Sequence, residues 1–181
     1  MNRERLEKNI IDQIKEAQIK LGYAQETVRL YYPVSSLNAL LETKQPDAEA
    51  MLGLLKASFS ADTGRLGKLS FCIHGGRIEI SVPPEGAEYV HEKIETPEFL
   101  AELIELFANH HACSREDICR MFSRFSPDYV CERMPDGADF DYVMYFQDPS
   151  IDEYYYCIKE EMGHTIYHRF MKEDYQAIRE A

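Results

Sequence analysis

The fold class is decided by the stretch Leu69-Ser70-Phe71-Cys72-Ile73-His74-Gly75-Gly76-Arg77-Ile78-Glu79-Ile80-Ser81-Val82. Apolar and polar residues alternate on both sides of its glycine pair, and a period of two is typical of strands that bury one face. Two adjacent glycines supply the positive φ angles that a tight hairpin turn requires. The stretch therefore predicts an antiparallel β-hairpin. A phosphate-binding loop is not indicated at Gly75-Gly76, because such a loop leads from a strand into a helix.

A second antiparallel sheet is predicted in the last third of the chain. The large side chains Phe140, Tyr142, Met144 and Phe146 occupy every second position there, which again indicates strand periodicity. Glycine-containing turn signals stand before this run, at residues 136–137, and after it, at residues 161–163. We predict a four-strand meander, followed by a short helix, with strands at about 129–134, 139–147, 153–159 and 164–170.

Helices are predicted in much of the remaining sequence. Leu6, Ile10 and Ile14 recur at every fourth position, which places them on one face of a helix. Capping and proline signals indicate four more helices, and β-branched and aromatic residues at 27–32 indicate a short strand. The predicted helices cover roughly residues 6–21, 35–41, 46–59, 97–109 and 114–125.

Helices and antiparallel hairpins that occupy separate parts of a chain are typical of the α+β class. We therefore expect an antiparallel β-hairpin and a C-terminal four-strand meander packed with about four to five helices. A chain of 181 residues is the size of one domain, so we predict a single α+β domain over residues 1–181.

Negative charge is concentrated in two stretches of this chain, whose formal net charge is −12. Residues 128–161 contain ten acidic and two basic residues, and residues 85–105 contain seven glutamates and one lysine. Nucleic acids and anionic membrane surfaces require clustered basic residues, so both are unsuitable partners. An acidic surface suits a basic protein partner or a cation.

The cysteines and the N-terminal residues indicate a cytoplasmic protein. Five cysteines stand at wide, irregular spacings, whereas a secreted disulfide framework usually has an even number in a shorter chain. The first residues carry charges of both signs without an apolar core, so a signal peptide is not predicted. No apolar run approaches the ~20 residues that a membrane-spanning helix needs.

No sequence motif with a known catalytic mechanism is present, and no cofactor is predicted. The weak metal or thiol candidates are the adjacent His110 and His111, Cys113, and the pair His164 and His168. In the predicted strand, the last two histidines would lie about 13 Å apart, which is too far for one ion. A row of glutamates, including Glu98, Glu102 and Glu105, is a further candidate for divalent cations, although a solvated helix face explains the same spacing.

The predicted partner-binding residues are Asp139, Asp141 and Tyr145, which lie on the exposed face of the second predicted strand, opposite the large side chains of its buried face. Carboxylates beside an aromatic ring provide charge steering and an anchor for a partner. We therefore predict a non-enzymatic, acidic binding protein for a basic protein partner, of the inhibitor or immunity-like kind. The alternative is a metal- or thiol-dependent enzyme that uses the histidines and cysteines.

A resemblance adds to this prediction. The stretch from Gly22 to Leu37, which reads GYAQETVRLYYPVSSL, resembles the N-terminal part of an uncharacterised family of small Firmicutes proteins, classed as a domain of unknown function. The resemblance implies a bacterial cytosolic protein of similar length. It implies no activity and therefore assigns no role to any residue.

Overall fold

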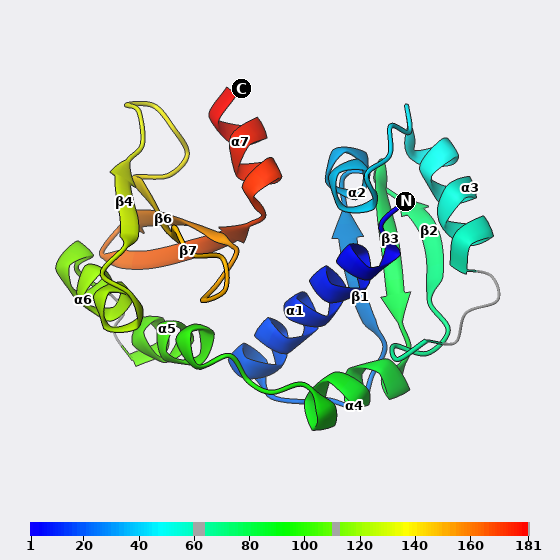
Figure 1. Cartoon of the computed structure of the whole chain (residues 1–181), viewed down its shortest axis with the longest axis horizontal. Helices are drawn as coiled ribbons and strands as arrows, with labels where there is room; N and C mark the ends of the chain where they lie inside the picture. The colour runs from blue at the N-terminus through cyan, green and yellow to red at the C-terminus, as the bar shows by residue number, and fades with distance from the viewer. Residues whose placement is uncertain (60–63, 110–112, 181) are drawn as a thin grey trace. The chain divides into compact units, whose positions relative to one another are not determined.

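The computed structural model describes residues 1–59, 64–109 and 113–180. The chain divides into two compact units, Met1–Thr96 and Pro97–Ala181. Each unit contains one antiparallel sheet with accompanying helices (Figure 1), which confirms the predicted α+β class. The single domain over residues 1–181 stays a prediction, since two compact units can belong to one domain.

The N-terminal unit is built on a three-strand sheet with the order β1-β3-β2. The strands are β1 (Val28–Tyr32), β2 (Ser70–His74) and β3 (Arg77–Val82). Gly75 and Gly76 connect β2 to β3 with φ angles of 57° and 78°, which are the left-handed values of a type I′ turn. The predicted hairpin is therefore confirmed. Strand β1 pairs with the other side of β3, where Tyr32 stands opposite Ile78.

Four helices belong to the same unit, and they are α1 (Arg3–Leu21), α2 (Val34–Leu41), α3 (Ala48–Phe59) and α4 (Pro84–Lys93). The predicted apolar face of α1 is buried, since Leu6, Ile10 and Ile14 are at most 1% exposed. On β3, Ile78 and Ile80 are fully buried as well. The core of this unit thus comes from the residues whose spacing indicated it.

Helix α4 is missing from the sequence prediction, and its first residues explain the difference. Pro83-Pro84 ends β3, but Pro84 also occupies the first turn of α4, where the absent N–H costs no helical hydrogen bond. Gly86 is required two residues later, because a Cβ there would lie 2.4 Å from the carbonyl oxygen of Leu66. With α4 included, the described residues form seven helices rather than the four to five expected.

The C-terminal unit contains the predicted meander, a four-strand sheet with the order β4-β5-β6-β7. The strands are β4 (Tyr129–Arg133), β5 (Tyr142–Phe146), β6 (Tyr155–Glu161) and β7 (His164–Phe170). The second predicted strand begins three residues too early, because residues 139–141 form a bend before β5. Met162 and Gly163 join β6 to β7 with φ angles of 51° and 79°, which is again the geometry of a type I′ turn.

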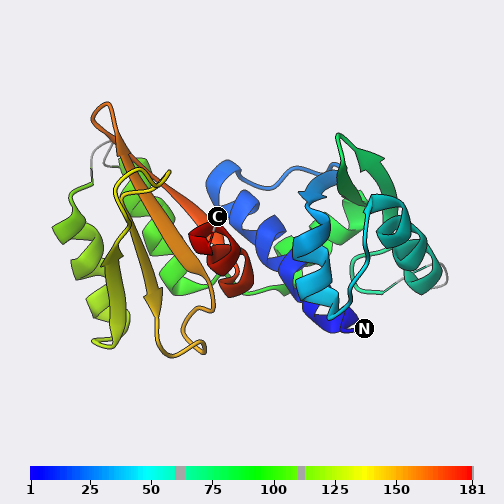
Figure 2. The same cartoon turned by 90° about the horizontal axis from the view of Figure 1, so that it is seen from above.

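Helices α5 (Glu98–Asn109) and α6 (Arg115–Phe125) pack on one face of this sheet, and α7 (Lys172–Glu180) packs on the other. Figure 2 shows the sheet between α6 and α7. On the first face, the Phe99 ring meets those of Phe146 and Tyr156 at centroid distances of 4.8 and 5.5 Å. On the second face, Tyr175 of α7 packs with Val143. Both faces of the sheet therefore contribute to the core of this unit.

Candidate functional site

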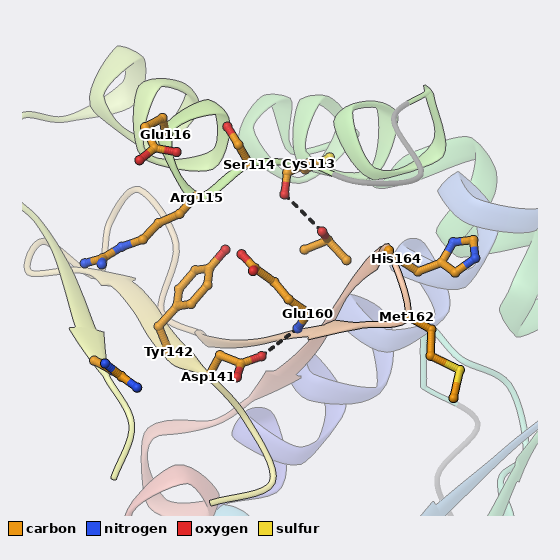
Figure 3. Close-up of a pocket in the computed structure, with 12 residues that line it drawn as sticks. Cys113, Ser114, Arg115, Glu116, Asp141, Tyr142, Glu160, Met162 and His164 are labelled. Atoms are coloured by element: carbon orange, nitrogen blue, oxygen red, sulfur yellow. Dashed lines mark hydrogen bonds between the residues drawn. The ribbon is translucent and has the colours of Figure 1, made fainter. Parts of the chain in front are cut away.

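A groove of about 720 Å³ lies at one end of the sheet of the C-terminal unit (Figure 3). We call it the α6 groove, because residues 113–116 at the start of α6 form one wall. The other walls come from the end of β4, the start of β5 and the β6–β7 hairpin. Segments from four parts of the C-terminal unit therefore meet at this site.

The wall at the start of α6 is held in place by a capping box. Ser114 Oγ accepts a hydrogen bond from the backbone N–H of Asp117 at 3.1 Å, and the Asp117 carboxylate accepts one from the Ser114 N–H. This reciprocal arrangement satisfies N–H groups that have no partner inside the helix. The hydroxyl of Thr165 on β7 donates to the Cys113 carbonyl oxygen at 3.0 Å. The helix start is thereby attached to the edge of the sheet.

Tyr142 forms the floor of the α6 groove and carries its most unusual atom. Its side chain lines the groove, yet the residue is only 4% exposed. Among the described residues, its hydroxyl oxygen has no hydrogen-bond partner. Burial raises the pKa of this phenol, and the charge of Glu160 raises it further, so the hydroxyl keeps its proton at neutral pH. A buried hydroxyl without a partner costs free energy that a ligand can recover.

Two acidic residues, Glu160 and Asp141, line the groove near Tyr142. Figure 3 shows the Glu160 carboxylate next to that hydroxyl, with both groups directed toward the segment Cys113-Ser114. Asp141 accepts a hydrogen bond from the backbone N–H of Glu160 at 2.6 Å. This bond ties the bend before β5 to the end of β6. The floor of the groove therefore combines an unsatisfied hydroxyl with negative charge.

Two arginines also line the α6 groove, but their guanidinium groups have other contacts. Arg133 is exposed and forms an ion pair with Asp136 at 3.4 Å. Cys131 of β4 raises the pKa of the Arg115 guanidinium, whose carbon atom lies 5.7 Å from the centre of the Tyr142 ring. In Figure 3, the Arg115 side chain extends away from Glu160. These arginines therefore leave the space beside the Glu160 carboxylate open to a ligand.

The three predicted partner-binding residues lie in different surroundings. Asp139 is exposed in the bend before β5, and Asp141 lines the α6 groove. Tyr145 is half-buried on the α7 face, where its ring stacks on Tyr155 at 4.2 Å. The prediction placed Tyr145 on an exposed face, whereas α7 and its neighbours cover that face. Of the three residues, only Asp141 is part of the groove.

The candidate metal and thiol residues do not form a shared site in the part of the chain that the structure describes. His110 and His111 lie outside the described residues. Cys113 is buried, and burial raises the pKa of its thiol, with a further contribution from Asp117. His164 and His168 are both on β7, as predicted, and His168 contacts the ring of Phe140 at 5.3 Å. Across residues 1–59, 64–109 and 113–180, no group of three His, Cys, Asp or Glu side chains could hold a metal ion.

The glutamate row on α5 has a partner that the sequence did not indicate. Glu102 forms an ion pair with Arg124 of α6 at 2.8 Å. Residues that are far apart in sequence meet here because the two helices lie on the same face of the sheet. The ion pair compensates part of the charge that made Glu98, Glu102 and Glu105 a candidate for cations.

Sequence analysis missed Tyr142 and Glu160 as site residues. Tyr142 was assigned to the buried face by its position in the alternating run, and that assignment is correct for its ring. Whether its hydroxyl has a hydrogen-bond partner depends on α6 and on the end of β6, which come from other parts of the sequence. The register of β5 and β6, which pairs Tyr142 with Ile158, would have been needed to place Glu160 beside it.

Comparison with protein families gives one match. Residues 3–179 match the model of a domain of unknown function with an E. rectale gene description, DUF3877. The chain belongs to the DUF3877 family. This confirms the resemblance suggested by the stretch from Gly22 to Leu37. Comparisons of this DUF3877 protein with curated proteins and with solved structures gave no match.

The described helices of this DUF3877 protein were also compared with the requirements of a bilayer. None of them is both long enough and apolar enough to span a membrane. The longest, α1, has 19 residues and carries charged residues along its length.

Proposed function

We propose that this DUF3877 protein is a non-enzymatic binding protein whose C-terminal unit engages a basic protein partner. The observation that carries the proposal is the floor of the α6 groove, where a buried hydroxyl with no hydrogen-bond partner among the described residues stands beside a carboxylate. The proposal keeps the predicted class of partner and moves the centre of the binding site from Tyr145 to Tyr142 and Glu160.

The distribution of charge between the two units supports this proposal. Residues 97–181 contain 8 lysines and arginines and 18 aspartates and glutamates, a net charge of −10. Residues 1–96 contain 12 lysines and arginines and 14 aspartates and glutamates, a net charge of −2. Almost all of the negative charge therefore belongs to the unit that contains the α6 groove. A field of this sign accelerates the approach of a basic partner and repels an acidic one.

The chemistry of the groove floor specifies the group that would bind there. A lysine ammonium has three donors and no acceptor. Placed beside Glu160, it would donate to the carboxylate and to the lone pairs of the Tyr142 hydroxyl. Hydrogen bonds to charged groups are each worth about 1.5–3 kcal/mol. One lysine side chain could thus satisfy the hydroxyl and balance the carboxylate together.

The proposal is tested with a fluorescein-labelled, lysine-rich peptide as the probe and a neutral glycine–serine peptide as its control. We expect fluorescence anisotropy to detect binding of the lysine-rich peptide alone, weakening as salt concentration rises. Glu160→Gln should lower the affinity about tenfold, the equivalent of ~1.4 kcal/mol. The Asp139→Asn, Asp141→Asn double variant tests the predicted carboxylates without disturbing the stacked ring of Tyr145.

Glu161→Gln is the matched control for Glu160→Gln. Glu161 is adjacent in sequence, is exposed and faces Lys159 at 3.6 Å, so its replacement changes the net charge equally without altering the groove floor. We expect this control to change the affinity less than about twofold. Equal losses in both variants would mean that only the overall charge attracts the peptide, and would refute a site at Tyr142.

The predicted alternative is a metal- or thiol-dependent enzyme, and it has a separate test. Native mass spectrometry of the untagged protein, before and after denaturation, detects any bound metal or ligand as extra mass. A stoichiometric mass that disappears on unfolding would favour the enzyme. The proposed cytoplasmic location is consistent with the structure to the extent that all five cysteines are free thiols.

A further inference from the structure

A pair of thiols lies between α6 and β4, beside the α6 groove. Cys131 is paired with Met144 in the sheet, so its side chain points to the face that α5 and α6 cover. Cys119 is one helical turn after Arg115 and lies on the same stripe of α6. Both cysteines are half-buried. Helix and strand therefore bring together two thiols that are twelve positions apart in the sequence.

Contacts on both sides of the two thiols align this part of α6 with the sheet. One turn after Cys119, the ring of Phe122 lies 5.9 Å from the ring of Tyr129 on β4, measured between centroids. One turn before Cys119, the guanidinium carbon of Arg115 lies 5.7 Å from the centre of the Tyr142 ring on β5. Cys119 and Cys131 therefore occupy facing positions between these two contacts. Burial raises the pKa of the Cys131 thiol, and Arg115 opposes this effect because its positive charge favours the thiolate. A half-buried thiol beside a cation is an environment that promotes thiol exchange.

From these contacts we propose that Cys119 and Cys131 form an intrachain disulfide by reaction with a low-molecular-weight disulfide of the glutathione class. The inference does not depend on the proposed binding function. Thiols on facing positions of a helix and a strand need only a local adjustment to reach the disulfide S–S length of about 2.05 Å. Strand β4 is at the edge of its sheet, so it has a neighbouring strand on one side only and can shift toward α6.

The reaction consists of two balanced exchange steps. One protein thiolate attacks a sulfur of the small disulfide, whose S–S bond breaks and releases one small thiolate. The second protein thiolate then attacks the protein sulfur of the mixed disulfide, forming the Cys119–Cys131 bond and releasing the second small thiolate. The protein loses two electrons and two protons, and the small disulfide is reduced to two thiols.

The other three cysteines are in different environments. Cys72 is exposed on β2 of the N-terminal unit, and it is the natural site for a mixed disulfide that goes no further. Cys113 and Cys157 are buried, and burial raises the pKa of both thiols, that of Cys157 to about 12. A small disulfide cannot easily reach a thiol that the protein covers, so these two cysteines react slowly. We therefore expect the disulfide to form between Cys119 and Cys131 and between no other pair of cysteines.

The test equilibrates the full-length protein with mixtures of reduced and oxidised glutathione, blocks the free thiols with N-ethylmaleimide and maps the digested peptides by mass spectrometry. We expect a cross-linked peptide pair containing Cys119 and Cys131, about 2 Da lighter than the two reduced peptides because two hydrogens are lost. Reduction with dithiothreitol should abolish the pair. The wild-type protein supplies the decisive result, so no variant has to fold for the test to be valid.

Three serine variants sharpen the result. Cys119→Ser and Cys131→Ser should each abolish the cross-link and leave the remaining thiol as a glutathione adduct. Cys72→Ser should leave the cross-link unchanged. Glutathionylation of Cys72 without any Cys119–Cys131 link, at ratios that oxidise an exposed thiol, would overturn the proposal. A link between any other pair of cysteines would overturn it as well.

Discussion

A single oxygen atom, the hydroxyl of Tyr142, distinguishes the α6 groove from an ordinary surface depression. The hydroxyl lacks a partner in the described part of the chain although the residue is 4% exposed. Tyr156, on the neighbouring strand, is also buried, but its hydroxyl donates to Asp152 at 3.0 Å. Two buried tyrosines in one sheet thus differ in whether the hydroxyl has a hydrogen-bond partner, and the effect of that difference can be measured.

We expect Tyr142→Phe to leave the free energy of unfolding unchanged or to raise it by up to ~1 kcal/mol, because it removes an unsatisfied buried hydroxyl. The same variant should weaken binding of the lysine-rich peptide about three- to tenfold. Tyr156→Phe is the matched control, and it should lower the free energy of unfolding by about 1–3 kcal/mol because Asp152 loses a donor. Urea denaturation measures both. A large loss in Tyr142→Phe would mean that its hydroxyl has a structural partner.

The buried thiol of Cys157 leads to a prediction about folding stability at alkaline pH. Its thiol is fully buried, and burial raises its pKa to about 12, whereas an unfolded cysteine ionises near pH ~8.5. Between these values the unfolded state binds fewer protons than the folded state, so stability is lost as the pH rises. Relative to Cys157→Ala, wild-type protein should lose up to ~1.4 kcal/mol more per pH unit above pH ~9.

Denaturation curves of wild-type protein and Cys157→Ala at pH 8, 9 and 10 test this prediction. The cavity left by the substitution lowers stability by the same amount at every pH, and the tyrosines with raised pKa values contribute equally to both proteins. The difference in free energy of unfolding between wild-type protein and Cys157→Ala should therefore become smaller as the pH rises. A constant difference would show that the Cys157 thiol ionises equally in both states.

At the scale of elements, the β6–β7 hairpin contains a conformational cost that a substitution can remove. Met162 has a φ of 51° and is 94% exposed, so a residue with a side chain adopts the left-handed conformation without gaining burial. That conformation costs roughly 1 kcal/mol for most residues, and asparagine before glycine is the preferred pair for this turn. Met162→Asn should raise the free energy of unfolding by about 0.5–1 kcal/mol.

Gly163→Ala is the opposite control for this turn. Gly163 has a φ of 79°, which alanine tolerates poorly. The free energy of unfolding of this variant should therefore fall by about 1 kcal/mol. Thermal unfolding followed by circular dichroism measures both changes. If Met162→Asn gave no gain, the left-handed conformation would not limit the stability of the hairpin.

The elements also show which parts of the fold the sequence could predict. Alternation and turn glycines located both hairpins, because periodicity and positive φ angles are local properties of the chain. Helix α4 was missed because Pro84 can end a strand and begin a helix at the same position, and only tertiary packing at Gly86 favours the second outcome. The groove was missed for a related reason, since Tyr142, Glu160 and the start of α6 meet only after the sheet has formed.

For the molecule as a whole, the testable property is the independence of the two units. Each has its own sheet and its own buried residues, and the division falls between Thr96 and Pro97. We expect a fragment of residues 97–181 to fold alone, with a circular dichroism spectrum of mixed helix and strand and a cooperative thermal transition. An unfolded fragment would favour the single domain predicted from the sequence.

Arg115 acts on both sites, since its charge opposes the rise in the pKa of the Cys131 thiol and its guanidinium carbon lies 5.7 Å from the centre of the Tyr142 ring. A ligand that moves this guanidinium would change the free energy of oxidising the thiols. Reciprocity requires that oxidation then changes the affinity for that ligand by the same factor. The same coupling free energy could then be measured in two ways, from the ligand affinity of the groove or from the reduction potential of the thiols.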